Sequence, residues 1–209
     1  MRQVGSLLAR LAGWGAIAGA ILWPVALAVL ADAVRLMQIE PVEPMPTVGS
    51  PGSLLAPPVF LFAAAVAALE LRATTAIGLA DLVGDLSIAV AGVVFLLPSL
   101  LVSVVPLPDG LLGPGLLMLL VGSVIFGVAG LDGKRRPRWG SALIGSGAGG
   151  LLASIVAIGA LGPDQLESVT ATGLLSLLLY SAGWAWLGVH LALARPLTLA
   201  VRGPGERPG

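Results

Sequence analysis

Six long runs of apolar residues, separated by short polar or proline-rich stretches, dominate this sequence. Each run has about the length, ~18 residues or more, that an α-helix needs to cross the ~30 Å hydrocarbon core of a bilayer. The pattern therefore predicts an all-α integral membrane protein, a bundle of six transmembrane helices in a single domain covering residues 1–209. The predicted spans are residues 11–30, 54–71, 82–105, 111–131, 141–161 and 169–194.

The first span begins after two arginines and ends at Ala31-Asp32-Ala33, which has the small-residue spacing of a signal-peptidase site. Its apolar run of 20 residues is longer than the roughly 7–15 residues of a signal-peptide core. We therefore expect a first span that is retained. Pro24 is expected to kink it, because proline removes a helical hydrogen bond and clashes with the preceding turn.

The third span has a polar stripe on its first turns. Gly78, Asp81 and Asp85 follow one another at spacings of three and four, which places them on one face of a helix. A helix running from Thr75 to residue 105 would be ~46 Å long, well beyond a ~30 Å core. We therefore expect this helix to tilt, to break at a glycine, or to begin outside the core.

Small residues recur at a spacing of four in the first and fifth spans. Inside lipid, packing rather than hydrophobicity drives helix association, and small side chains let two helices approach closely. These residues are predicted to be helix-packing positions: Ala12, Gly15, Ala16, Gly19 and Ala20 in the first span, and Ser141, Gly145, Gly149 and Ala153 in the fifth.

The composition agrees with a membrane protein and excludes several kinds of site. The chain is 57% hydrophobic and 11% charged, with a mean hydropathy of +1.01, whereas soluble domains are roughly 25% charged. There is no cysteine and a single histidine, which excludes disulfides, thiol chemistry and multi-histidine sites. We predict no metal and no cofactor. The zero net charge gives no basic face for nucleic acid, and the Ala-, Gly- and Arg-rich composition suggests a prokaryotic source.

The basic loop between the fourth and fifth spans sets the expected orientation. Six spans with both termini in the cytoplasm place ten of the eleven basic residues on the inner side, as the positive-inside rule requires. We expect the chain in the inner (cytoplasmic) membrane of the cell. Lys134, Arg135, Arg136 and Arg138 are assigned a topological role, facing anionic lipid headgroups that contribute ~1 kcal/mol per basic residue.

Three acids lie near the cytoplasmic ends of the spans. Glu70, Asp81 and Asp85 are candidates for holding a cation or relaying protons, because charged groups close to hydrocarbon are costly and are often functional. Their carboxylates would suit a hard cation. The competing interpretation is that they sit in headgroup water and pair with Arg72 or with the basic loop.

Trp186 and His190 share a face of the last span and could line a ligand pocket inside the bundle. Equally, tryptophan anchors helices at the membrane interface, and a histidine near a helix end can bond headgroups or the last carbonyls. The sequence leaves these two interpretations of Trp186 and His190 open.

Three short patterns resemble signatures of membrane enzymes. Gly78-x-x-Asp81-x-x-x-Asp85 is similar to part of the aspartate motif of CDP-alcohol phosphotransferases, but the upstream Asp-Gly-x-x-Ala-Arg portion is absent. Gly84-Asp85 resembles half of the signature of intramembrane aspartyl proteases, without its first glycine. A six-span chain with Ser146 and His190 resembles rhomboid proteases, which implies a serine–histidine dyad, although the serine lies on a different span.

Three functions remain after these comparisons. The preferred hypothesis is a non-catalytic membrane-embedded subunit or scaffold, which packs its small-residue stripes against a membrane-protein partner or a second copy of itself. The second is a small-solute transporter, because the size, the six spans and the long first outer loop resemble the substrate-binding components of energy-coupling-factor transporters. The third is an intramembrane hydrolase that uses Ser146 and His190. We expect no enzymatic activity.

Overall fold

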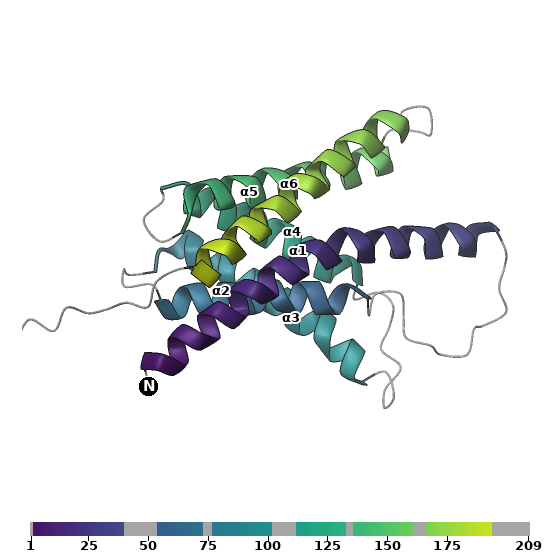
Figure 1. Ribbon diagram of the computed structural model, residues 1–209. Coiled ribbons are helices and arrows are strands. Elements are labelled where there is room, and N and C mark those ends of the chain that lie inside the picture. The colour runs from purple at the N-terminus through teal and green to yellow at the C-terminus, as the bar shows by residue number, and fades with distance from the viewer. Residues whose placement is uncertain are drawn as a thin grey trace, which may run out of the picture.

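The computed structural model describes residues 2–39, 54–72, 77–101, 112–132, 136–160 and 166–193 (Figure 1). These residues form six α-helices and short 3₁₀ segments, with no strand among them. The prediction of an all-α protein is therefore confirmed for this part of the chain. The helices are α1 (Arg2–Ile39), α2 (Ala56–Arg72), α3 (Leu79–Leu101), α4 (Leu112–Ala129), α5 (Arg138–Ala160) and α6 (Leu166–Leu193), with η3 (Gly130–Asp132) after α4.

Five of these helices are long and apolar enough to cross a membrane, which supports a multi-pass membrane protein. They are all but α2, whose 17 residues reach ~26 Å against a ~30 Å hydrocarbon core. Helix α1 extends past the predicted first span in both directions. It contains Pro24, and its axis changes direction partway along (Figure 1).

Helix α3 shows how the third span begins. The helix starts at Leu79, and the amide of Leu82 donates to the carbonyl of Gly78 at 3.0 Å. Asp81 and Asp85 therefore lie within a helix that is continuous with the apolar segment. The expected helical turn at Thr75, and the end of the predicted span beyond residue 101, fall outside the described residues.

The helices form a closed ring. Each packs against its neighbours in the sequence, and α6 returns to pack along α1. In Figure 1, α5 and α6 run side by side as an antiparallel pair, with α1 lying next to α6. Because the ring is closed, the middle part of each helix faces the same interior. Large apolar side chains such as Trp14, Ile21 and Val156 remain exposed outside, as a lipid-facing surface requires.

Glycines bring the backbones together at the ring's interfaces. At four of them, a Cβ built on a glycine would lie less than 3 Å from a backbone atom of the neighbouring helix, so only hydrogen fits. This close approach is the main source of packing energy between helices in lipid. The facing pairs are Gly84–Gly122 between α3 and α4, Gly127–Gly145 between α4 and α5, and Gly13–Gly188 between α1 and α6.

The interior of the ring is filled by aromatic side chains from four helices. Phe62 of α2 stacks on Trp184 of α6, with ring centroids 4.4 Å apart and an interplanar angle of 11°. Phe126 of α4 stacks on the same tryptophan at 5.7 Å. Tyr180 and Trp23 complete the group, 5.9 Å apart. All five side chains are buried, so this aromatic core joins the helices around the ring.

Candidate functional site

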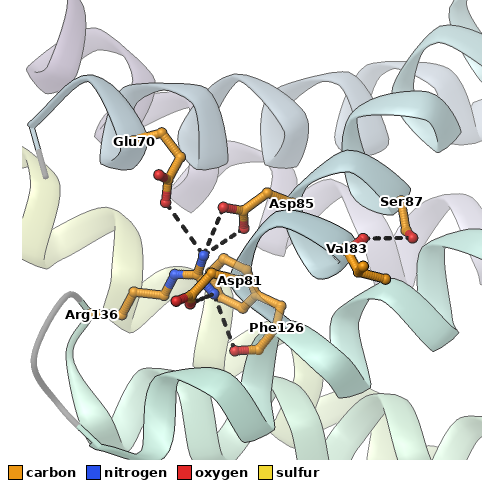
Figure 2. A network of polar contacts seen from close by, with 7 residues as sticks. All are labelled: Glu70, Asp81, Val83, Asp85, Ser87, Phe126 and Arg136. Carbon is orange, nitrogen blue, oxygen red and sulfur yellow. Dashed lines mark hydrogen bonds and ion pairs between the residues drawn. The ribbon is translucent and has the colours of Figure 1, made fainter. Parts of the chain in front are cut away.

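Arg136 is a buried arginine at one end of the ring. It precedes Pro137, whose carbonyl accepts from the amide of Ser141 at 3.0 Å in the first turn of α5. Proline fixes the backbone at this helix start, which directs the preceding residue out of the helical conformation. Only 2% of Arg136 is exposed, and its side chain reaches α2, α3 and α4 (Figure 2).

The strongest contact of Arg136 is with Asp85 of α3. Nη2 of the arginine donates to both carboxylate oxygens of Asp85, at 2.6 and 2.7 Å. These are short distances for a charge-assisted hydrogen bond, and both groups are buried. Because an unpaired charge near hydrocarbon is costly, neither side chain would be stable here without the other.

Two further carboxylates surround the same guanidinium. Glu70, in the last turn of α2, lies 3.3 Å from Nη2, and Asp81, in the first turn of α3, lies 3.3 Å from Nη1. The carboxylate of Glu70 is opposed by the negative end of the α2 dipole, so a neighbouring cation offsets that repulsion. We call Glu70, Asp81, Asp85 and Arg136 the Arg136 cluster; Figure 2 shows the three acids around the arginine.

Phe126 joins α4 to this cluster in two ways. Its main-chain carbonyl accepts from Nη1 of Arg136 at 3.4 Å, and its ring lies 4.0 Å from the guanidinium carbon. A guanidinium over an aromatic face gains cation–π energy, which is larger where water is excluded. Since Phe126 also stacks on Trp184, the Arg136 cluster is continuous with the aromatic core.

The sequence left two roles open for the three acids, and the structure places them around Arg136 of the basic loop. The expectation that Arg136 faces lipid headgroups differs from what the structure shows, because its side chain is buried against these carboxylates. Arg138 is exposed at the start of α5, whereas Lys134 and Arg135 fall outside the described residues.

The other two ligand candidates lie apart from the cluster. Trp186 is 54% exposed and its ring lies along Gly140 of α5, and His190 is exposed near the end of α6. Arg72 donates from Nη1 to the carbonyl of Leu191 at 3.3 Å, so it caps the end of α6. The tryptophan of α6 that lies inside the ring is Trp184.

Most of the predicted helix-packing residues face neighbours within the chain. In α1, Ala16 and Ala20 are buried, Gly15 and Gly19 lie against α2, and Ala12 is half-buried. In α5, Ser141 is buried, and Gly145 and Gly149 face α4. Ala153 is exposed. The two stripes thus contribute mainly to the ring's own interfaces.

Ser146 and His190 are both exposed. The hydroxyl of Ser146 donates to the carbonyl of Leu143 at 3.3 Å, and within the described ranges no hydrogen bond joins it to His190. The exposed position of Ser146 follows from its place on α5, where Gly147 beside it is the residue that faces α6.

One buried polar contact, between Ser123 and Tyr180, was not predicted from the sequence. The hydroxyls of Ser123 and Tyr180 are hydrogen-bonded at 2.9 Å across the ring, between α4 and α6. Nε1 of Trp23, Nε1 of Trp184 and Nε of Arg136 are buried and have no partner among the described residues. No local sequence pattern distinguishes such residues from ordinary apolar positions, because only ring closure brings them inside.

The Arg136 cluster can hold charge and exchange protons at one end of the bundle. Among the described residues, no three His, Asp or Glu side chains are placed to hold a metal ion. A guanidinium stays protonated in proteins, whereas each carboxylate can accept a proton. Any chemistry in this cluster is therefore carried by Glu70, Asp81 and Asp85.

No family model matches the chain, and the searches of curated proteins and of solved structures found no match either.

Proposed function

We propose that this multi-pass membrane protein is a small-solute transporter, in which the Arg136 cluster closes one end of the helix ring. The observation that carries the proposal is the buried guanidinium bound to Asp85 and surrounded by carboxylates from α2 and α3. Ionisable groups inside membrane domains are rare and commonly mark substrate or ion routes. Breaking these ion pairs would free α2 and α3 from the start of α5, which is the kind of change a transporter needs.

The hypothesis of a subunit that packs against partner helices rested on the small-residue stripes of the first and fifth spans. Within the described residues, those stripes mostly meet other helices of the same chain. The ring also closes on itself through Gly13 and Gly188. A chain that satisfies its own packing surfaces has less need of a partner, which favours the transporter over the subunit.

The proposal includes an orientation and a membrane. If α2 is the sixth span, both termini and the Arg136 cluster lie on the cytoplasmic side of the inner membrane. The support is the charge distribution, with ten of the eleven basic residues on that side. The cluster would then act as the inner closure of the ring.

Purification in a gentle detergent, followed by native mass spectrometry, tests this function. We expect a chain without a stoichiometric protein partner and with a bound small molecule, which is then tested for uptake into proteoliposomes. Arg136→Gln should reduce uptake at least tenfold, whereas Arg138→Gln, an exposed arginine two residues away, should not. A stoichiometric membrane-protein partner with no bound solute would contradict the proposal and favour the subunit.

A further inference from the structure

Glu70 and Asp85 come from different helices but meet at one nitrogen atom. Nη2 of Arg136 lies 2.6 and 2.7 Å from the oxygens of Asp85 and 3.3 Å from Oε1 of Glu70. Two carboxylates that contact the same nitrogen must lie close to each other. The side chain of Asp85 is only 11% exposed and that of Glu70 only 20%, so water screens the repulsion between the two carboxylates poorly.

Two buried carboxylates in such contact are more stable with a proton between them. When like charges share a site, the first ionises readily and the second holds its proton, as in paired-carboxylate enzymes. The guanidinium favours one ionised carboxylate through its short contacts to Asp85. It cannot donate to both acids equally, because Glu70 lies more than half an ångström farther from the same nitrogen.

A second observation at this position concerns the arginine itself. Nε of Arg136 is a buried donor with no acceptor among the described residues, even though three carboxylates surround the other end of the group. A buried donor normally has a partner, and ordered water is the smallest one available. A water at Nε would satisfy this donor.

We propose that Glu70 and Asp85 form a proton-binding site, in which one proton is shared between the two carboxylates at neutral pH. The proton comes from water, an O–H bond forms on one carboxylate oxygen, and no other covalent bond changes. The presence of a shared proton does not depend on the proposed function. A role for that proton in driving transport does rest on the proposed function. Release of the proton would add a negative charge beside Asp85 and strengthen the hold of Arg136.

Several other charged groups lie at this end of the ring. Asp81 contacts Nη1, the other terminal nitrogen of Arg136. Arg72 of α2 is directed to the end of α6. The side chains of Asp132 in η3, Arg138 in α5 and His190 in α6 are exposed, so solvent screens them. Arg10 of α1 is likewise exposed.

Infrared spectroscopy of the purified protein near neutral pH tests the site without any transported solute. We expect the C=O stretch of one protonated carboxylic acid per chain, which shifts in D₂O. The band should disappear in both Glu70→Gln and Asp85→Asn, because each leaves a single carboxylate at Nη2 of the arginine. The band should persist in Asp81→Asn, because the carboxylate of Asp81 contacts the other terminal nitrogen, Nη1. It should also persist in Asp132→Asn, because Asp132 is exposed.

Absence of the band from the unsubstituted chain, or its persistence in both Glu70→Gln and Asp85→Asn, would overturn the proposal. If those variants do not fold, the same spectrum is measured on Asp85→Glu, which retains a carboxylate at this position. A change in the frequency of the band in Asp85→Glu would assign the proton to the Glu70–Asp85 pair. An unchanged frequency in Asp85→Glu would assign it elsewhere and overturn the inference. If the band is present but the protein takes up no solute into proteoliposomes, the transporter proposal is contradicted and the proton-binding site is not.

Discussion

The side chain of Arg136 is about 1% exposed and contacts acids from two helices and a carbonyl from a third. Its contribution to stability is asymmetric. A buried ion pair replaced as a whole by apolar groups often costs little, whereas removal of one partner leaves a buried charge uncompensated. Asp85 would carry most of that cost, because both of its oxygens bind the arginine.

We therefore expect Arg136→Leu to destabilise the protein by about 3–5 kcal/mol. Thermal unfolding in detergent, followed by circular dichroism, measures the loss. Arg138→Leu is the matched control, since an exposed substitution usually changes stability by less than about 0.5 kcal/mol. Adding Asp85→Leu to Arg136→Leu should recover part of the stability, and a further loss in that double variant would show that Asp85 is stabilised by other groups.

The hydrogen bond between Tyr180 and Ser123 is a second residue-scale test. It lies in the interior, at 2.9 Å between the two hydroxyls. Interhelical hydrogen bonds in membrane proteins average about 0.6 kcal/mol, with about 1.7 kcal/mol at most. We expect Tyr180→Phe and Ser123→Ala each to cost about 0.5–1.5 kcal/mol. Their double variant should cost less than the sum of the two, and strict additivity would argue against the contact.

At the scale of elements, the glycines determine how closely the helices approach. Gly127 of α4 faces Gly145 of α5, and a Cβ added to Gly127 would come within 2.6 Å of the backbone nitrogen of Gly145. Backbone cannot move aside as a flexible side chain can, so the two helices would have to separate. Gly113, near the start of the same helix, has no atom within 4 Å of its Cβ position.

This difference yields a matched pair of substitutions in α4. We expect Gly127→Ala to destabilise the protein by about 1–3 kcal/mol, because it overpacks a backbone contact. Gly113→Ala should be neutral or stabilising by up to about 1 kcal/mol, because alanine favours the helix. Unfolding midpoints of the two variants give the comparison, and equal midpoints would contradict the interface.

At the scale of the whole molecule, the proposed function requires a topology with six spans. Helix α2 is shorter than the other five, but it lies between α1 and α3 in the closed ring. If α2 spans the membrane, the ring has six spans and both termini share a side. If it does not, the two termini lie on opposite sides.

The absence of cysteine makes this topology directly measurable. Single substitutions Lys134→Cys and Arg207→Cys should react with a membrane-impermeant maleimide only after the cells are permeabilised. Pro44→Cys and Pro108→Cys should react in intact cells. This pattern follows from six spans with the charge distribution of the positive-inside rule. If α2 did not span, only α3 would separate residues 44 and 108 across the membrane, and they would lie on opposite sides. Reaction of only one of Pro44→Cys and Pro108→Cys in intact cells would therefore contradict six spans.

The class of fold could be predicted from the sequence because it depends on local properties. Apolar runs of membrane-spanning length require helices, since the backbone must satisfy its own hydrogen bonds in lipid. Glycine and alanine at a spacing of four likewise indicate a face of close packing whatever the neighbour is. The concentration of acids at the ends of the second and third spans is equally visible, because spacing along one helix determines which residues share a face.

The tertiary structure decided which residues meet. Arg136 looked like one of four equivalent basic residues in a loop, and only the packing of α2, α3 and α4 around the start of α5 selects it for burial. The aromatic core has the same origin, since Trp23, Phe62 and Trp184 come from three different helices. The lipid outside the ring and the protein inside it are similarly apolar. Hydropathy alone therefore cannot distinguish the face of a helix that points into the ring from the face that points to lipid. Ring closure makes that distinction.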